Sequence, residues 1–221
     1  MGNEREVKVD IGGKRYLITS DDNYLGHIRN VFEPHMVRLF KSLIHKNDHV
    51  LDIGANIGCT SILFAGLSEM VYSFEPSTTT FLYLQKNISC SGLRNIEMFN
   101  IGLGSISCES ILTFARSNRS GGFVSDQIKA SPGHITEKII IKTVDDVVGS
   151  LKTSIIHFIK IDVEGFECHV INGATNTIVT HKPIVLLEMN HWCLNVFQRT
   201  SIPDFFELLR LHFPILYAVE G

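Results

Sequence analysis

The chain has 221 residues, of which 44% are hydrophobic and 19% are charged. This length allows one sizeable α/β domain, and the composition is that of a globular protein with little extended disorder. The formal net charge of −3 argues against a nucleic-acid partner, because proteins that bind a phosphate backbone usually carry a clustered basic excess.

The first part of the chain predicts a hairpin and then a helix. Residues 7–11 alternate apolar and polar side chains, and residues 16–18 can return after a turn at Gly12-Gly13. Pro34 can begin a helix, because proline suits the first helical position. The apolar residues of that helix follow helical spacing: Met36, Leu39, Phe40, Leu43 and Ile44.

From residue 49 onward, short apolar strands alternate with amphipathic helices. The expected strands are residues 50–53, 71–74, 96–101, 155–161, 184–187 and 215–219. The expected helices are residues 58–65, one with Phe81, Leu84 and Ile88 on one face, one with Val170, Ala174 and Ile178, and one from Ser201 to about His212. This alternation predicts an α/β fold with a doubly wound, mostly parallel sheet.

Residues 104–149 depart from this alternation. Residues 111–115 and 139–143 predict extra strands around a loop at Gly121-Gly122, so we expect a β insertion after the third strand. Three basic residues surround that loop and are expected to form a solvated face: Arg116, Arg119 and Lys129.

A glycine-rich segment, Val50-Leu-Asp-Ile-Gly-Ala-Asn-Ile-Gly58, joins a buried strand to a helix. Glycines let the backbone approach a ligand, and a helix N-terminus offers unpaired N–H groups. A dinucleotide fingerprint that starts at Gly54 would need glycines at positions occupied by Asn56 and Cys59. The segment therefore indicates a nucleotide-type ligand and disfavours a nicotinamide-dependent oxidoreductase.

Two carboxylates close the strands next to this segment. Asp52 would repel a phosphate and suits a ligand with a positively charged amino group. Glu75 closes the following strand, where a carboxylate can accept hydrogen bonds from both hydroxyls of a ribose. The order of the two favours a ligand that combines an amino group with a nucleoside.

Four blocks resemble the FkbM family of methyltransferases: residues 50–58, Phe74-Glu-Pro-Ser77, Thr143-Val-Asp-Asp146 and Lys160-Ile-Asp-Val-Glu-Gly-Phe-Glu167. Asn172-Gly-Ala174 and Glu33-Pro34 fit as well, so the resemblance spans roughly residues 33–189. It implies a Rossmann-like class I methyltransferase fold and S-adenosyl-L-methionine as the cofactor. In that case residues 1–48 form a hairpin and helix that pack on the core, and residues 49–221 form the methyltransferase domain.

The resemblance also assigns cofactor-binding residues. The loop with Asp52, Gly54, Asn56 and Gly58 would hold the methionine part of S-adenosyl-L-methionine. Glu75 would hold the ribose, and the segment from Asn100 to Gly102 would lie near the adenine.

The carboxyl ends of the later strands supply candidates for catalysis. The resemblance implies that Asp162 ends the fourth strand close to the transferred methyl group, and strand alternation would send Glu164 to the same side. His191 follows the fifth strand and is a candidate base, because the imidazole pKa of ~6.5 suits proton transfer near neutrality. Glu188 and Asn190 could join Asp162 around Mg²⁺, but the resemblance requires no metal and we expect none.

The cysteines and the N-terminus bear on the cellular compartment. Cysteines at positions 59, 90, 108, 168 and 193 form no CxxC pair, which indicates reduced thiols in a cytoplasmic-type compartment. The N-terminus has no apolar signal core, and no apolar run reaches the ~20 residues of a membrane helix. We therefore expect a cytoplasmic protein that does not bind a membrane, and its oligomeric state stays open.

The leading hypothesis is an S-adenosyl-L-methionine-dependent O-methyltransferase that acts on a hydroxyl of a small sugar or secondary metabolite. The alternative is a non-catalytic S-adenosyl-L-methionine or nucleoside-binding module, or a fragment of a larger multidomain enzyme. Methyltransferases of this fold usually finish with a seventh strand, and the sequence stops at Gly221 directly after the sixth. We therefore expect a domain truncated before its last strand.

Overall fold

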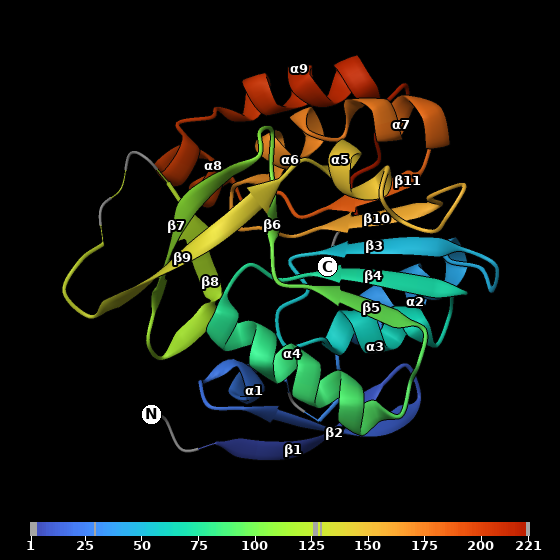
Figure 1. Ribbon diagram of the computed structural model, residues 1–221, viewed down its shortest axis with the longest axis vertical. Coiled ribbons are helices and arrows are strands. Elements are labelled where there is room, and N and C mark those ends of the chain that lie inside the picture. Colours follow the sequence, from blue (N-terminus) through green and yellow to red (C-terminus); the bar gives the residue numbers. More distant parts are fainter. Residues whose placement is uncertain (1–3, 29, 126–127, 129, 220–221) are drawn as a thin grey trace.

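Five parallel strands form the centre of the structure, a computed structural model that describes residues 4–28, 30–125, 128 and 130–219. In chain order they are β3 (His49–Ile53), β4 (Met70–Phe74), β5 (Ile96–Phe99), β10 (Phe158–Ile161) and β11 (Ile184–Leu187). The order across the sheet is β11-β10-β3-β4-β5, from top to bottom in Figure 1. The expected doubly wound parallel sheet is confirmed, and its strand order reverses between β3 and β10.

Alternating side chains of the strands feed two separate cores. On β3, Val50 belongs to one core, and Leu51 and Ile53 belong to the other. The first core is covered by β1 (Arg5–Ile11), β2 (Lys14–Ser20), α1 (Tyr24–His27), α2 (Pro34–Leu43), α3 (Cys59–Ala65) and α4 (Thr78–Ser91). The second is covered by α5 (Val144–Val148), α6 (Glu167–Asn172), α7 (Thr175–His181), α8 (His191–Gln198) and α9 (Ile202–His212). Both faces of the sheet are therefore buried, as parallel sheets require.

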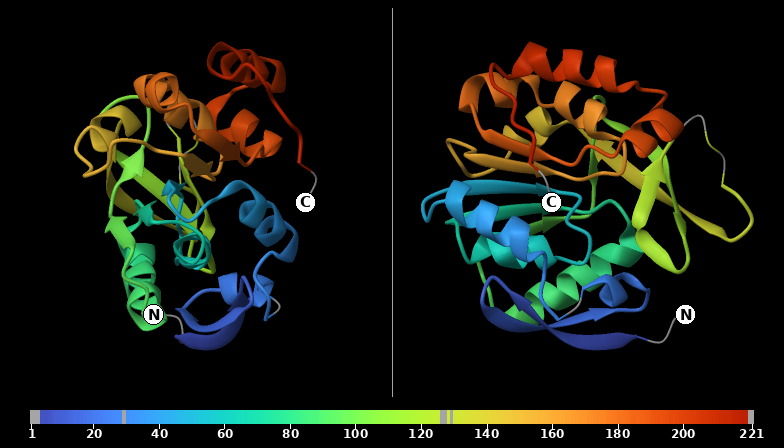
Figure 2. Two further views of the ribbon diagram at one scale, coloured as in Figure 1. Left: turned by 90° about the vertical axis from the view of Figure 1, so that its right-hand side faces the viewer. Right: turned by 180° about the vertical axis from the view of Figure 1, so that it is seen from behind.

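The hairpin of β1 and β2 lies at one end of the molecule and α9 at the other (Figure 2). Asn87 of α4 fastens the hairpin to the rest of the chain. Its Oδ1 accepts a hydrogen bond from the Thr19 backbone N–H at 2.8 Å, and its Nδ2 donates to the carbonyl oxygens of Thr19 and Ile57 at 3.1 and 2.9 Å. One buried amide thus joins the hairpin to the glycine-rich loop.

A second, four-stranded sheet follows β5, which confirms the expected β insertion. Its strands are β6 (Gly102–Leu103), β7 (Cys108–Ala115), β8 (Asn118–Val124) and β9 (His134–Lys142), in the order β6-β9-β7-β8. The prediction of a loop at Gly121-Gly122 was wrong, because both glycines lie within β8. The ring of Phe123 anchors that strand by stacking on Phe197 of α8, with the centroids 3.9 Å apart.

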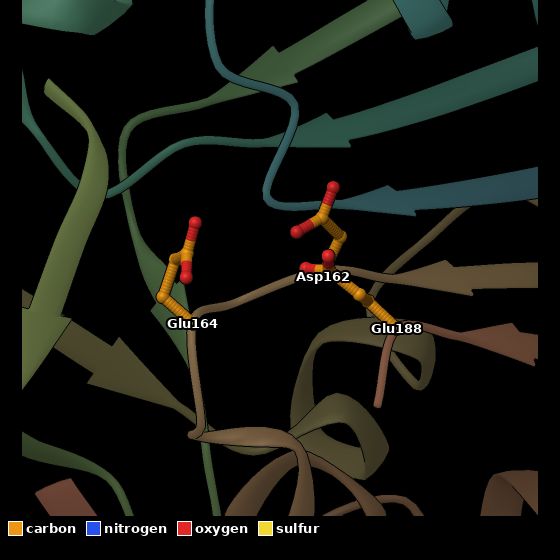
Figure 3. Close-up of side chains that lie close together, drawn as sticks. All are labelled: Asp162, Glu164 and Glu188. Carbon is orange, nitrogen blue, oxygen red and sulfur yellow. The ribbon is translucent and has the colours of Figure 1, made fainter. Parts of the chain in front are cut away.

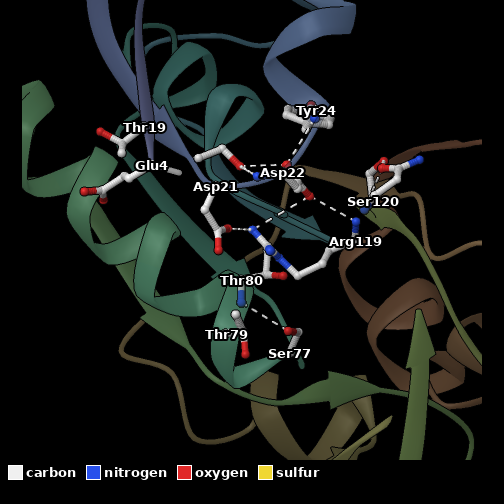
Figure 4. A network of polar contacts seen from close by, with 12 residues as sticks. Glu4, Thr19, Asp21, Asp22, Tyr24, Ser77, Thr79, Thr80, Arg119 and Ser120 are labelled. Carbon is white, nitrogen blue, oxygen red and sulfur yellow. Dashed lines mark hydrogen bonds and ion pairs between the residues drawn. The ribbon is translucent and has the colours of Figure 1, made fainter. Parts of the chain in front are cut away.

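Arg119 was also expected in a solvated face, and this expectation is wrong. Its side chain is buried, and its guanidinium makes ion pairs with Asp21 and Asp22 at the end of β2 (Figure 4). The Arg119 backbone N–H donates to Asp22 Oδ2 at 3.0 Å. Two carboxylates of the hairpin compensate the buried charge. Arg116 is exposed, and Lys129 lies outside the described residues.

Three further elements differ from the expectation. The strand at 96–101 ends at Phe99, after which β6 joins the second sheet. The helix through 170–178 is divided into α6 and α7 at Gly173, whose absent Cβ would lie 2.0 Å from the carbonyl oxygen of Gly104. Residues 215–219 are exposed and form no strand, because no described strand lies beside them to share backbone hydrogen bonds.

Short helices were harder to find in the sequence. The helices α1, α5 and α8 were not expected, although Thr143 caps α5 by accepting a hydrogen bond from the Asp146 N–H. Among the described residues, no helix combines the length and apolar character needed to cross a membrane. All five cysteines are free thiols.

Candidate functional site

A cavity of about 1940 Å³ opens at the carboxyl ends of the central strands. It lies at the reversal of strand order between β3 and β10, the place where open α/β sheets bind ligands. Its walls include the loops after β3, β4, β10 and β11, the second sheet, and the start of α2. It also extends along β11 to residues 213–219.

The glycine-rich loop forms one wall of the cavity. Its first glycine, Gly54, is required by the packing of the loop and not only by a ligand. Gly54 has φ +83°, and a Cβ there would lie 1.9 Å from the carbonyl oxygen of Asp162. No other residue tolerates this approach, so Gly54 seats the loop against the end of β10. Gly58 begins α3 and packs beside Leu84, outside the described cavity-lining residues.

Asp52 is fully buried and does not reach the cavity. Strand alternation directs its carboxylate under α3, where Oδ2 accepts a hydrogen bond from Ser61 Oγ at 2.6 Å. Burial raises the pKa of Asp52, and the ammonium of Lys160 opposes that rise from 3.7 Å. The expectation that Asp52 receives the ligand's amino group is therefore corrected, because a carboxylate with no exposed surface cannot contact a ligand.

Lys160 is a buried cation that the sequence analysis did not select. It lies opposite Asp52 in the β10–β3 register, and its Nζ is 3.0 Å from Asp162 Oδ2 and 3.2 Å from the Gly54 carbonyl oxygen. Burial opposes its charge, but Asp162 and Asp52 outweigh that effect and raise its pKa. A lysine inside the apolar run Phe158–Ile161 was the signal that could have revealed it.

Glu75 stands at the end of β4 and is 7% exposed. Its Oε2 accepts a hydrogen bond from the Asn56 N–H at 3.0 Å, and its Oε1 accepts one from the Ser77 N–H at 2.9 Å. Burial nevertheless raises the pKa of Glu75 to about 7. Both Glu75 and Asn56 line the cavity, so the carboxylate joins the loops after β3 and β4 and still faces the ligand space.

Asn100 and Gly102 occupy different positions around this wall. The amide Nδ2 of Asn100 donates to the carbonyl oxygens of Glu75 and Pro76 at 2.9 and 3.1 Å, and its Oδ1 accepts from Thr78 Oγ1 at 3.3 Å. Asn100 thus holds the loop after β4 and is not among the described residues that line the cavity. Gly102 does line it, between Ile101 and Leu103.

Three carboxylates lie close together where β10 and β11 end (Figure 3). Asp162 and Glu164 follow β10, Glu188 follows β11, and one carboxylate oxygen from each lies within 4.8 Å of the others. The strand ends at Ile161, so strand alternation did not bring Glu164 here. Glu164 instead adopts a left-handed backbone conformation with φ +51°, and its Oε2 accepts a hydrogen bond from Cys193 Sγ at 3.2 Å.

The protonation states of Asp162 and Glu188 are linked. Burial opposes ionisation of Asp162, but the Lys160 ammonium and hydrogen bonds from Glu188 and Lys160 outweigh it and lower the pKa of Asp162. Burial and the Asp162 carboxylate raise the pKa of Glu188. The two residues therefore share a proton that resides on Glu188, and Asp162 carries the negative charge.

Glu167 supports this turn from within the core. It is fully buried, and its Oε1 accepts hydrogen bonds from the Val163 and Gly165 N–H groups, both at 3.2 Å. Burial raises the pKa of Glu167 to about 7. It is the acidic residue in the first turn of α6.

His191 and Asn190 do not face the cavity with Glu188. The Asn190 side chain caps α8 by accepting a hydrogen bond from the Cys193 N–H at 3.2 Å, and His191 is exposed on the first helical turn. The expectation that His191 is a base at the site gains no support, because His191 lies outside the described residues that line the cavity. Glu164 takes the position near Asp162 that the metal hypothesis gave to Asn190.

Comparisons with known proteins agree with this architecture. Residues 52–212 match the methyltransferase FkbM domain. The hexuronic acid methyltransferase AglP of Haloferax volcanii is 30% identical over 151 residues, which cover 66% of this chain and 58% of that protein. The crystal structure of methyltransferase FkbM from Methylobacillus flagellatus KT superposes with a TM-score of 0.51 at 20% identity.

That superposition covers 76% of this chain and 38% of the crystallised one, so this chain spans little more than half of one relative and less than half of the other. At 20% identity the structural likeness concerns the fold alone. The Rossmann-like fold expected from the sequence is confirmed.

Proposed function

The chain belongs to the methyltransferase FkbM family and its cofactor is S-adenosyl-L-methionine; from this premise we propose that it methylates a hydroxyl of a sugar or secondary-metabolite acceptor. The observation that carries the proposal is the position of the Asp162 carboxylate on the cavity wall, 3.0 Å from Lys160 Nζ and beside Glu188, at the end of β10 against which the glycine-rich loop packs. A sugar acceptor is supported by the relative that methylates a hexuronic acid.

The residues of the first wall fit the cofactor. Glu75 keeps acceptor capacity on both carboxylate oxygens after binding two backbone N–H groups, which suits the two ribose hydroxyls. Ile101, Gly102 and Leu103 offer an apolar surface for the adenine, with Phe74 and Pro76 beside it. The methionine part would then lie along residues 54–60, toward Asp162.

When bound, S-adenosyl-L-methionine supplies a methyl group on a sulfonium sulfur, which leaves as a neutral thioether. Methyl transfer is an in-line displacement, so most of the catalytic effect comes from holding the acceptor oxygen in line with the methyl group. Asp162 suits that task, because its charged carboxylate can accept the hydrogen bond of the acceptor hydroxyl and so orient the oxygen.

The hydroxyl also loses its proton during the transfer, and we propose that the Asp162 carboxylate takes up this proton. A positioned base of this kind contributes roughly 10²–10⁴-fold to a rate. Lys160 keeps the carboxylate ionised before the reaction, and the Glu188 carboxyl donates a hydrogen bond to it. Glu164, engaged by Cys193, borders the same space and would contact the acceptor.

The experiment is a transfer assay with S-adenosyl-L-methionine labelled in the methyl group. Acceptors are neutral hexosides, hexuronosides and polyhydroxylated secondary metabolites, and the labelled product is treated with mild alkali. We expect an alkali-stable methyl ether. An alkali-labile methyl ester on a uronic acid carboxyl would contradict O-methylation of a hydroxyl, and an absence of transfer despite tight S-adenosylhomocysteine binding would support a binding module.

A further inference from the structure

Glu33 lines the cavity from a segment that precedes the matched residues 52–212. It is the N-cap of α2, with φ 31° and ψ 67°, a left-handed conformation that costs energy for a residue with a side chain. Pro34 follows, and a residue before proline is normally extended. Strain of this kind persists where the surrounding structure enforces it, and it is common where proteins hold ligands.

The surrounding chain holds Glu33 in this position. The Asp10 N–H donates to the carbonyl oxygen of Asn30 at 2.8 Å, and the Phe32 N–H donates to the carbonyl oxygen of Asp10 at 2.9 Å, so β1 fixes the segment before it. The Val37 N–H donates to the Glu33 carbonyl oxygen at 2.9 Å and begins α2. The helix does not use the Glu33 carboxylate as a cap, so the strain serves no local hydrogen bond.

Glu33 differs from the other carboxylates near the glycine-rich loop. Asp52 is fully buried beside Ser61 and Lys160, and Asp162 is held 3.0 Å from Lys160 Nζ. Glu164 accepts a hydrogen bond from the Cys193 thiol. The Glu33 carboxylate, in contrast, makes no hydrogen bond or ion pair with any residue that the structure describes, although it faces the cavity.

Glu33 lines the same cavity as residues 54–56, 59 and 60 of the glycine-rich loop and the start of α3. Glu33 is an exposed residue whose partial desolvation raises its pKa, while the Lys160 ammonium lowers it and the charges of Asp162 and Asp52 raise it further. Burial raises the pKa of the Cys59 thiol, and the Glu33 charge adds to that rise. Glu33 therefore acts electrostatically on a residue of the loop that is proposed to hold the methionine part.

We propose that the Glu33 carboxylate binds the α-ammonium group of the methionine part of S-adenosyl-L-methionine. The ammonium is a strong donor that needs an accessible carboxylate, and Glu33, which has no partner among the described residues, provides one where the buried Asp52 does not. Lys160 does not form an ion pair with Glu33, because its ammonium contacts Asp162, Asp52 and the Gly54 carbonyl oxygen instead. This inference rests on the cofactor assignment and is independent of the acceptor.

The test uses two ligands that differ in the amino-acid part. S-Adenosylhomocysteine carries the α-ammonium, whereas 5′-methylthioadenosine keeps the adenosine and lacks the amino acid. Calorimetric titration of Glu33→Gln should show S-adenosylhomocysteine binding weakened by roughly 10–100-fold, the effect of losing a charged hydrogen bond. The affinity for 5′-methylthioadenosine should stay within about twofold. Glu207→Gln, at an exposed position of α9, is the matched control.

A second variant separates ligand binding from stability. Glu33→Gly relieves the left-handed strain, so the Tm should rise by roughly 2–4 °C while S-adenosylhomocysteine binding weakens as in Glu33→Gln. Unchanged S-adenosylhomocysteine affinity in both variants would overturn the proposal, as would equal weakening of both ligands. If the wild-type protein bound neither ligand, the cofactor assignment itself would fail, a result distinct from either of these.

Discussion

The two sides of the cavity hold their carboxylates in different ways. After β3 and β4, the carboxylate of Glu75 is fixed by backbone N–H groups of Asn56 and Ser77. After β10 and β11, the carboxylates of Asp162, Glu164 and Glu188 lie within 4.8 Å of one another and depend on side chains. The first side thus presents a fixed backbone surface, whereas on the second side neighbouring side chains set the protonation of each carboxylate.

This difference matches the tasks proposed for the two sides. A cofactor of constant shape can be held by rigid backbone, because hydrogen bonds from the main chain lose little entropy on binding. Proton transfer requires groups whose pKa values are separated by their surroundings: Lys160 lowers the pKa of Asp162, whereas burial and the Asp162 carboxylate raise the pKa of Glu188. Lys160 also contacts Gly54, so it joins the two sides.

The largest effect is expected for Asp162→Asn, which removes the proton acceptor from the side-chain wall. Turnover should fall by roughly 10²–10³-fold, because a neutral amide cannot accept the proton. S-Adenosylhomocysteine affinity should change less than about threefold, since the other wall is intact. Steady-state rates and calorimetry on the same preparation measure both. A comparable loss of both quantities would show that the two sides do not work separately.

Gly54→Ala tests the main-chain wall. The new Cβ would lie 1.9 Å from the Asp162 carbonyl oxygen at φ +83°, so the free energy of unfolding should fall by about 2–4 kcal/mol. Gly92→Ala is the control, because Gly92 has φ +74° with no atom within 4 Å of the new Cβ, and it should cost about 1 kcal/mol. Urea unfolding compares the two variants, and equal losses would refute the close-contact argument.

Glu75 predicts a pH dependence of stability. Its pKa of about 7 in the folded protein lies above its ordinary value, so the folded state keeps a proton that the unfolded chain releases. The free energy of unfolding should therefore fall as the pH rises from about 5 to about 7, and level off above that. For a buried carboxyl, this fall in the free energy of unfolding is on the order of 3 kcal/mol.

Glu75→Gln should flatten this slope, even though the amide disturbs one backbone hydrogen bond. Glu167, buried below the turn after β10, has the same raised pKa of about 7, so part of the slope should remain in the variant. Unfolding titrations at several pH values give the comparison. A slope identical to that of the wild type would mean that Glu75 titrates normally.

The smallest effect is expected for Glu188→Gln. If Glu188 holds the shared proton, a glutamine amide can still donate to Asp162, so turnover at pH 7 should stay within about threefold of the wild type. Glu188→Ala removes the donor and should reduce turnover by about tenfold. A loss in Glu188→Gln as large as in Asp162→Asn would instead show that Glu188 works as a charged group.

Periodicity and turn residues sufficed for most of the central fold. The strands at 50–53, 71–74 and 184–187 follow from short apolar runs, and the hairpin follows from alternation around two glycines. The expectation of a strand at 215–219 was wrong because an apolar run needs a neighbouring strand. The prediction of a single helix through 170–178 was also wrong, since the chain forms two helices that are divided where Gly173 lies close to Gly104.

The candidate site divides in the same manner. The sequence alone determined the glycine-rich loop, the acidic residues at the strand ends and the family, because these depend on local order along the chain. Only the tertiary structure decided that Asp52 is buried, that Lys160 bridges two carboxylates, and that Glu33 enters the cavity. Those facts depend on which residues meet across strands and on how each side chain is exposed, and neither is encoded in spacing along the chain.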